Sequence, residues 1–329
     1  MLIATPTEFS PTLDRLSPQA LHGVLNVNKP DGWTSHDVVK RVRSVLGLQK
    51  VGHAGTLDPH ATGVLPLLLG KGTKIADYLF SWEKEYVATV RFGQRTDTQD
   101  AWGSVIQETS TDSLTEEQVR GAFSAFRGEI QQVPPMFSAV KVGGQPLYKR
   151  ARKGQTVDRS PKTVTIHQLD IQHLALPEVT FRVRCSKGTY VRTLCEDVGE
   201  KLGVGGHLIQ LQRNRVGPLK VGDAVNVDIL QKNLEFSRLN GAFWGVDEIL
   251  HRLPVAKVHG DDVRKVLHGN ALPWGHFAME GLEDSKGNVE ETPVRVKNDE
   301  GKLLALGAIT CNPIAKTSPM LSINTVLGS

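Results

Sequence analysis

The chain has 329 residues, 39% of them hydrophobic and 22% charged, with a formal net charge of +4; these values are typical of a folded protein of about two domains and exclude fibrous and disordered chains. Its three cysteines show no C-x-x-C spacing, and their odd number gives no disulfide framework, which predicts a reducing, cytoplasmic location. No apolar run approaches the ~18 residues that a membrane span needs, so no membrane association is expected.

The predicted elements begin after residues 1–22, which lack the basic start and the apolar run of a signal peptide. We expect this segment to be a flexible extension. A strand at 23–28 ends at a Lys-Pro-Asp-Gly turn. A helix follows, which Thr34 or Ser35 can cap and which Gly47 ends.

Residues 51–63 are rich in glycine and irregular, and the apolar run 64–69 directly after them predicts a short buried strand. The alternating segment 86–92 predicts a second strand of this region. A capping box at 115–118 then begins a helix, and Gly128 ends it.

Basic residues concentrate in the segment 136–163, which we expect to leave the body of the protein as a loop or a small lobe. Only Asp158 accompanies seven cations there, which are Lys141, Lys149, Arg150, Arg152, Lys153, Arg159 and Lys162. Such a cluster can neutralise the phosphates of a nucleic acid. A solvated loop would have the same composition, and charge alone does not separate the two interpretations.

Two strands, at 164–171 and 180–185, precede a helix expected over 189–203. Beyond residue 251, short strand-like pieces alternate with Gly, Pro and Asn and predict a small β domain over 251–329. Strands, helices and a final β region in this order favour an α+β fold, with a larger domain over 23–250.

The irregular segment 51–63 is the first candidate for chemistry. Its three glycines permit tight turns, and Asp58 precedes a proline, which holds the backbone extended and the carboxylate in one direction. A fixed carboxylate could serve as a nucleophile or a general base, although an isolated Asp-Pro pair is more often a plain turn. His53 and His60 stand apart with no cysteine near them, so no metal site is expected.

A second candidate is the segment 186–192, where a strand passes into a helix. Arg192 falls in the first helical turn, where the helix dipole disfavours a cation; a carboxylate partner would compensate, and an exposed arginine is the alternative. The loop 94–100 carries carboxylates that could pair with Arg192 or cap their own turn. Tyr86, at a strand start, could pack, stack on a base or exchange a proton.

Several well-known motifs are absent from the sequence. It has no phosphate-binding P-loop, no dinucleotide-binding glycine motif, no G-x-S-x-G elbow and no zinc deaminase signature. The sequence therefore gives no indication of nucleoside triphosphate, dinucleotide or acyl-enzyme chemistry.

Six sequence blocks occur in a fixed order between about residues 23 and 220. They begin at Asn28, His53, Lys84, Gly93, Cys185 and Gly206, and read N-K-P-x-G-x-T-S, H-x-G-T-L-D-P-x-A-T-G, K-x-Y, G-Q-R-T-D, C-S-K-G-T-Y-x-R and G-H-L-x-x-L-x-R. In order and spacing they resemble the bacterial TruB-type tRNA pseudouridine synthases. The block that contains Asp58 is the most specific of the six.

The resemblance implies a catalytic domain on a mixed, largely antiparallel sheet, followed by a PUA-like RNA-binding β domain near 251–329. It implies that 136–163 is a thumb-like insertion that grips the T arm. The implied reaction flips out the T-loop uridine at position 55 of tRNA, detaches its uracil and rejoins it to ribose through C5. No atoms enter or leave, so no cofactor is required. The implied partner is the tRNA T stem-loop, with no obligatory protein partner.

The resemblance also implies roles for single residues. Asp58 would act on the target nucleotide, by attack on the sugar, attack on the base or abstraction of a sugar proton. Arg192 and Asp97 would hold Asp58 in a charge network. Tyr86 would stack on the flipped uracil and help to remove its C5 proton. Three further residues would line the pocket or support the flipped-out loop: Tyr190, Leu211 and His53.

Two other interpretations stay open. A guide-RNA-dependent relative would share the Asp58 loop but lack the insertion 136–163. A non-catalytic tRNA-binding or tRNA-folding protein on the same scaffold would be favoured by loss of Asp58, Tyr86 or Arg192, and all three are present. His60 stands where the family usually carries an apolar residue, so we expect the local packing or an RNA contact to differ there.

Overall fold

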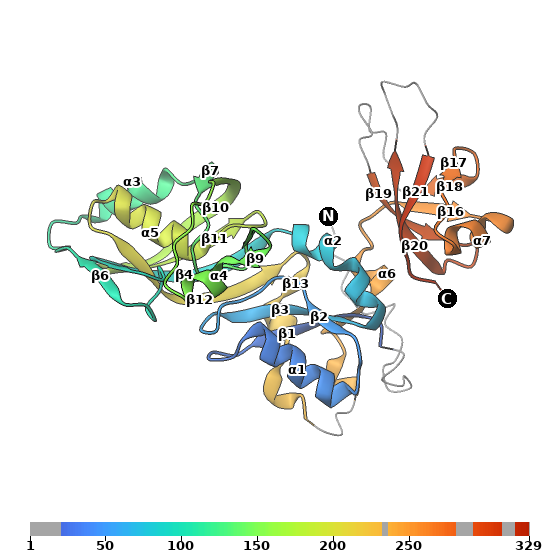
Figure 1. Ribbon diagram of the computed structural model, residues 1–329, viewed down its shortest axis with the longest axis horizontal. Helices are drawn as coiled ribbons and strands as arrows, with labels where there is room; N and C mark the ends of the chain where they lie inside the picture. The colour runs from blue at the N-terminus through green and yellow to red at the C-terminus, as the bar shows by residue number, and fades with distance from the viewer. Residues whose placement is uncertain (1–20, 232–235, 281–291, 311–319, 329) are drawn as a thin grey trace.

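A computed structural model describes residues 21–231, 236–280, 292–310 and 320–328. All but the last two residues of the expected extension 1–22 lie outside these ranges, and so does Cys311; the described Cys185 and Cys195 are free and buried. The described residues form a larger body built on a bent sheet and a smaller body with a sheet of its own (Figure 1).

The larger sheet has eleven strands among the described residues. They are β1 (Gly23–Lys29), β2 (Val51–His53), β3 (Thr62–Leu69), β4 (Lys84–Phe92), β7 (Gly128–Gln132), β10 (Lys162–Ala175), β11 (Glu178–Cys185), β12 (Gly206–Val216), β13 (Leu219–Lys220), β14 (Val225–Asn226) and β15 (Phe243–Gly245). The main path is β14-β1-β3-β12-β4-β11-β10-β7, and in the described part only β1–β14 and β3–β12 pair in parallel. The expected mixed, largely antiparallel sheet is confirmed.

Helices and two small hairpins surround this sheet. The helices around it are α1 (Ser35–Leu46), α2 (Ala76–Ser81), α3 (Glu116–Ser124), α4 (Leu147–Ala151), α5 (Val191–Lys201) and α6 (Val246–Ile249), with 3-10 turns η3 (Gly70–Ile75), η4 (Val221–Asp223), η5 (Val227–Ile229) and η6 (Phe236–Leu239). A further helix, α7 (Asp261–Leu267), belongs to the smaller body. The hairpins pair β5 (Gln94–Thr96) with β6 (Val105–Glu108), and β8 (Lys141–Val142) with β9 (Gln145–Pro146). No helix in the described ranges is long and apolar enough to span a membrane.

The helix starts follow from local capping. Thr34 caps α1: its hydroxyl accepts the Asp37 N–H, and the Asp37 carboxylate accepts the Thr34 N–H in return. Gly47 ends α1 in the left-handed conformation, at φ 62°. The capping box at 115–118 likewise begins α3, as predicted. However, α3 ends at Ser124, before the expected stop, because Gly128 already belongs to β7.

The strand β3 is buried on both faces, which explains its continuous apolar run. Leu65 and Leu67 lie in the core that α1, α3 and α5 share. Val64 and Leu68 face the other side, in a second core cluster that also contains Leu306 from the smaller body. Leu306 of the smaller body therefore shares one apolar cluster with the back of the strand that follows the Asp58 loop.

The smaller body is a six-stranded sheet over the described ranges, with α7 packed on it. Its strands are β16 (Val255–Val258), β17 (Leu272–Pro273), β18 (Phe277–Glu280), β19 (Thr292–Lys297), β20 (Leu303–Thr310) and β21 (Met320–Val326). Arg295 joins it to the larger body through the Asp247 carboxylate at 2.9 Å. The expected α+β class with a small C-terminal β domain is confirmed.

Candidate active site

The loop between β2 and β3 carries Asp58, and a buried lysine holds its backbone. Lys29 has no exposed surface, and its Nζ donates to the carbonyl oxygen of Pro59 at 2.7 Å. The same ammonium group donates to Trp33 O at 2.6 Å and to Pro30 O at 2.8 Å. Burial lowers the pKa of Lys29 to about 8, so the side chain still carries most of its charge at neutral pH. Lys29 therefore ties the Asp58 loop to the end of β1.

Arg213 and Ser35 hold the first half of this loop. The buried Arg213 guanidinium, from β12, donates to Gly55 O at 2.9 Å and to Val64 O at 2.7 Å. Ser35 Oγ, at the start of α1, accepts the Leu57 N–H at 2.9 Å and donates back to Leu57 O. Three separate elements thus fix the backbone on both sides of Asp58, as a reactive carboxylate requires.

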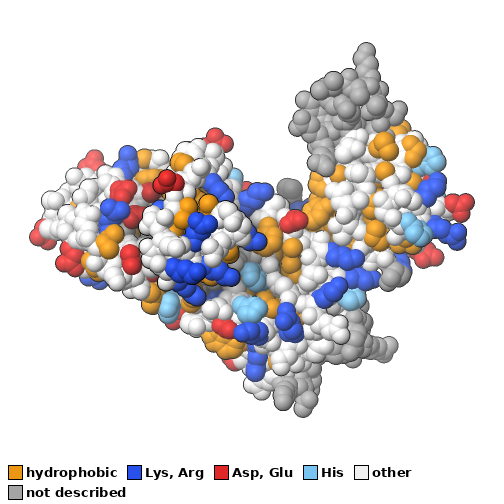
Figure 2. All heavy atoms as spheres, in the orientation of Figure 1, with side chains coloured by type: hydrophobic (Ala, Val, Ile, Leu, Met, Phe, Trp, Pro, Cys, Tyr) orange, Lys and Arg blue, Asp and Glu red, His pale blue; other side chains and the backbone are white. Residues whose placement is uncertain are grey.

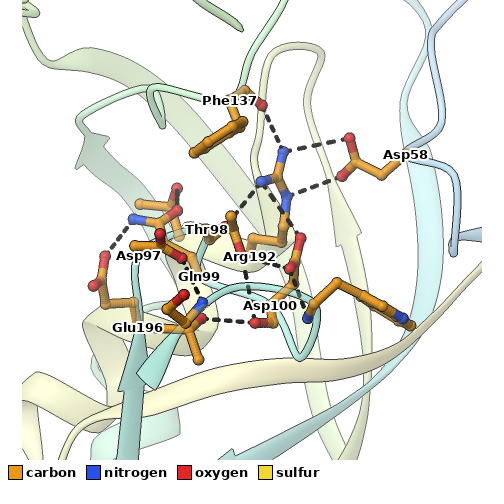
Figure 3. A network of polar contacts seen from close by, with 12 residues as sticks. Asp58, Asp97, Thr98, Gln99, Asp100, Phe137, Arg192 and Glu196 are labelled. Carbon is orange, nitrogen blue, oxygen red and sulfur yellow. Dashed lines mark hydrogen bonds and ion pairs between the residues drawn. The ribbon is translucent and has the colours of Figure 1, made fainter. Parts of the chain in front are cut away.

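Arg192 is the centre of the site (Figure 3). Only 6% of its side chain is exposed, and its Nε and Nη2 donate to the two carboxylate oxygens of Asp58 at 2.9 and 3.4 Å. Its other donors reach Thr98 O at 3.0 Å and Phe137 O at 2.9 Å, and Asp100 Oδ2 lies 3.7 Å away. The expected contact between Arg192 and Asp58 is present. One guanidinium therefore binds the Asp58 loop, the β5–β6 loop and the start of the basic segment.

Asp97, which was expected to join this network, binds within its own loop in the structure. Asp97 Oδ1 accepts the Ser104 N–H at 2.8 Å and closes the turn between β5 and β6. Asp100, three residues further on, is the carboxylate of this loop that faces Arg192. The loop turns between the two acids at Gln99, and this turn decides which of them reaches the guanidinium.

Gln99 is the one described non-glycine residue with a positive φ, at 64°. That conformation costs about 1–2 kcal/mol for a residue with a Cβ. Contacts with α5 hold it: the Gln99 amide donates to the Glu196 carboxylate, and its Oε1 accepts from Thr193 Oγ1 at 2.9 Å. Arg95 also binds Glu196, at 3.0 Å. Helix α5 therefore positions Arg192 and the loop that Arg192 binds.

Two opposing effects set the ionisation of Asp58. Burial raises the pKa of its carboxyl group, and the charge of Arg192 lowers it, with a net rise above the ordinary value. The burial is incomplete, because 43% of the Asp58 side chain is exposed, so water solvates part of the charge. Since Arg192 also contacts both oxygens, we expect Asp58 to be ionised at neutral pH.

A cavity of about 280 Å³ opens beside the Asp58–Arg192 pair. Phe137, Leu208 and Leu211 form apolar parts of its wall, so the structure places Leu211 where it was expected. The other three predicted binding residues, His53, Tyr86 and Tyr190, are not among the residues that line this cavity.

Tyr86 lies on β4, and Tyr190 directly precedes α5. Burial raises the pKa of both phenols, and the negative charge of Asp58 adds to each rise, so both lie within electrostatic reach of Asp58. Gln132 fixes Tyr190, since its side chain accepts the Tyr190 N–H at 3.0 Å and donates to Tyr190 O at 3.2 Å. Both phenols are therefore neutral at pH 7.

His53 ends β2, next to the Asp58 loop. Burial and the nearby charge of Arg213 lower the pKa of its imidazole, which is therefore neutral at pH 7. Its Nδ1 is buried and has no hydrogen-bond partner among the described residues.

The basic segment 136–163 contains β8, β9 and α4. Five of its cations are exposed: Lys141, Lys149, Arg152, Lys153 and Lys162. Figure 2 shows Lys and Arg side chains gathered over this part of the body. Arg150 and Arg159 are half-buried and donate to the backbone carbonyls of Val142, in the same segment, and of Pro134, just before it. Within the described ranges none of the seven pairs with a carboxylate, so the exposed five remain available to an anionic partner.

Several residues that build the site were not predicted from the sequence. Lys29 and Arg213 belong to blocks that carry the resemblance, and that was the signal that could have found them. Phe137 acts through a backbone oxygen, which leaves no trace in residue type. A stacked pair, His60 and Trp102, lies on the cavity wall and joins two loops far apart in the sequence.

Comparison with known proteins identifies the family. A profile of the TruB family pseudouridylate synthase N-terminal domain matches residues 43–191, and one of the tRNA pseudouridylate synthase B C-terminal domain matches 192–251. A protein named tRNA pseudouridine synthase B from Ralstonia nicotianae is 46% identical over 272 residues, which cover 81% of this chain and 86% of that protein. The chain belongs to the TruB family of pseudouridylate synthases. The expected enzyme class, an isomerase, is thereby confirmed.

Other relatives agree with this membership. Proteins of the same name from Ralstonia pickettii and Burkholderia pseudomallei (strain K96243) are 48% and 47% identical, over 77% and 80% of this chain and 80% and 84% of their own length. Among solved structures, the archaeal Cbf5 of a Nop10–Cbf5 complex superposes with a TM-score of 0.70 at 24% identity, covering 98% of this chain and 92% of that chain. The likeness to Cbf5 concerns the fold.

Proposed function

We propose that this chain converts the T-loop uridine at position 55 of tRNA into pseudouridine, with Asp58 as the residue that acts on the target nucleotide. The observation that carries the proposal is the Asp58 carboxylate, held at both oxygens by Arg192 and facing a cavity of about 280 Å³. The names of the relatives and the exposed cations beside the cavity support tRNA as the substrate.

The reaction is balanced without a cofactor. The bond from ribose C1′ to N1 of uracil breaks, a bond from C1′ to C5 forms, the C5 proton leaves and N1 regains a proton. The base must leave its stack to expose these atoms, and a bent loop lowers that cost. Asp58 could attack the sugar, attack the base or remove a sugar proton. Each role needs the ionised carboxylate, which the contact with Arg192 favours.

Tyr86 is proposed to stack on the flipped uracil and to help remove the C5 proton. Burial keeps its phenol neutral, so it can accept that proton only if it passes its own proton on. Tyr190 and Leu211 would complete the pocket around the base. His53 would support the conformation of the RNA loop from which the uridine has turned out.

The basic segment 136–163 is proposed to grip the T arm as a thumb. Replacing Lys149 and Lys153 together by glutamine should weaken tRNA binding and reduce the slope of log affinity against log salt by about one for each phosphate that is no longer neutralised. Arg120 and Lys201, exposed on α3 and at the end of α5, provide the matched control for the removal of two charges. Equal salt slopes for both double variants would contradict the thumb assignment.

The same insertion favours a stand-alone enzyme over a guide-RNA-dependent one, and the assembled Asp58–Arg192 pair favours catalysis over binding alone. We place the reaction in the cytoplasm with no obligatory protein partner. The C-terminal β domain would serve as a PUA-like RNA-binding domain.

The purified chain alone provides the test. Incubation with an unmodified tRNA transcript, followed by mapping of modified positions, should reveal pseudouridine at position 55. A transcript with cytidine at that position is the control and should stay unmodified. Conversion only after a guide RNA or a partner protein is added would contradict the proposal.

A further inference from the structure

Two aromatic rings are stacked on the wall of the cavity. The rings of His60 and Trp102 lie 3.9 Å apart, centroid to centroid, with 4° between their planes. His60 comes two residues after Asp58, and Trp102 lies in the loop between β5 and β6. Both line the cavity that Asp58 and Arg192 face.

Hydrogen bonds fix this pair relative to the catalytic ion pair. The backbone N–H of Trp102 donates to Asp100 Oδ1 at 3.1 Å, and the other oxygen of Asp100 faces Arg192. On the far side, His60 Nδ1 lies 3.0 Å from Asp31 Oδ1. The rings are therefore held in place before any ligand binds, so a ligand that stacks on them does not have to order them.

The packing of the protein does not account for the position of Trp102. Its residue surface is 51% exposed, and it belongs to none of the apolar core clusters of the described residues. Arg152, an exposed cation of the basic segment, lines the same cavity. An exposed aromatic ring in a cavity that an arginine also lines is a surface that suits an unpaired nucleic-acid base.

We propose that the indole of Trp102, supported from behind by His60, stacks on an RNA base adjacent to the target uridine. This inference rests on the proposed function, because it assumes that the cavity receives the flipped uracil next to Asp58. Neighbouring bases of a bent loop are unstacked from each other, and the cavity wall offers one of them a new stacking partner. The ligand is thus an unpaired base in a single-stranded loop.

The size of the effect follows from the chemistry. Stacking of one base on an aromatic side chain corresponds to about 5- to 150-fold in affinity. Trp102→Leu should therefore weaken binding of a T stem-loop RNA by this factor and raise KM more than it lowers kcat. Trp102→Phe, which keeps a smaller ring, should restore most of the loss. Ile106→Ala, on β6 and 59% exposed, is the matched control and should change nothing.

Combining Trp102→Leu with the removal of single bases from the RNA separates a stacking role of Trp102 from a purely structural one. Binding is measured in an Asp58→Asn background, with and without Trp102→Leu, on the intact stem-loop and on two RNAs with one abasic nucleotide directly 5′ or 3′ of the target uridine. On one of the two abasic RNAs, we expect Trp102→Leu to cause no further loss of binding affinity, because the base that stacks on Trp102 is already missing.

Two results would overturn the inference: unchanged affinity of Trp102→Leu for the intact RNA, or an equal loss on all three RNAs, which would indicate that Trp102 only packs its own loop. Wild-type conversion of the tRNA transcript is measured in parallel. If the wild type converts the transcript but Trp102→Leu does not change RNA affinity, only the stacking inference is contradicted. If the wild type does not convert the transcript, the proposed function is contradicted.

Discussion

Replacing Arg192 by lysine tests whether the shape of the guanidinium, beyond its charge, holds Asp58. The guanidinium contacts both oxygens of Asp58 and the carbonyl oxygens of Thr98 and Phe137. Lysine keeps the charge, but its donors radiate from one nitrogen and cannot reach all four oxygens. We expect the lysine variant to keep one hydrogen bond to Asp58. It should lose the second one and at least one hydrogen bond to a carbonyl oxygen.

The magnitude follows from the hydrogen bonds that lysine cannot make. Two hydrogen bonds to a charged group contribute about 1.5–3 kcal/mol each, or about 3–6 kcal/mol together. Water replaces part of this, because 43% of the Asp58 side chain is exposed, so we expect a loss of about 3–4 kcal/mol. If the loss falls on the transition state, kcat drops by roughly 10²- to 10³-fold, at about 1.4 kcal/mol per factor of ten.

The assay is single-turnover release of tritium from C5-labelled uridine in a tRNA transcript, with RNA affinity and thermal unfolding measured alongside. Arg127→Lys is the matched control, because Arg127 also binds a carbonyl, of Leu169, and a carboxylate, of Asp170, away from the cavity. Its turnover should equal that of the wild type. A less than tenfold fall for Arg192→Lys, with unchanged affinity and stability, would refute the reasoning.

Three further variants test other parts of the site and its support. Gln99→Ala should be less stable than Gln99→Gly by about 1 kcal/mol in chemical denaturation, because only glycine adopts φ 64° without strain; equal stabilities would contradict that argument. Lys29→Met should lower both kcat and Tm, since three carbonyl oxygens lose their donor, and an unchanged kcat would show that Lys29 does not hold the loop. Burial, and the charges of Glu196 and Glu200, raise the pKa of Asp197 to about 7 from 3.8. The native state therefore retains a proton that the unfolded chain releases, and this stabilisation, complete below pH 3.8, is lost as the pH rises through about 7. Asp197→Asn should accordingly gain stability relative to the wild type as the pH rises from 3.8 to about 7, and parallel pH profiles of the two over that range would contradict it.

Elements whose determinants are local could be predicted from the sequence. The start of α1 depends on a hydroxyl and a carboxylate within three residues of each other, and its end on one glycine. The strand β2 was missed, because its three residues lie in a glycine-rich stretch and pair with β3 further along the chain. Pairing of this kind is tertiary and leaves no periodic pattern in so short a segment.

The charge pairing of Arg192 with a carboxylate could also be predicted, because a cation in the first turn of a helix needs compensation. The choice between Asp97 and Asp100 could not. Both acids occupy one polar loop, and the left-handed conformation of Gln99, which contacts with α5 maintain, decides which of them faces Arg192.

The burial of two cations could not be predicted from residue type either. Lysine and arginine are rarely fully buried, so Lys29 and Arg213 would be placed on the surface by residue type alone. Their partners are backbone oxygens of the Asp58 loop, which come together only when the loop has its final shape. The stack of His60 on Trp102 likewise joins two loops that pair only in the folded chain.

The most direct test of the central claim compares the wild type with Asp58→Asn on an unmodified tRNA transcript. The amide has the shape of the carboxylate but no charge, so we predict pseudouridine formation by the wild type, none by the variant, and tRNA affinity within about threefold, because phosphate and stacking contacts lie elsewhere. Turnover by Asp58→Asn at a rate near that of the wild type would contradict the assignment of Asp58 as the residue that acts on the target uridine.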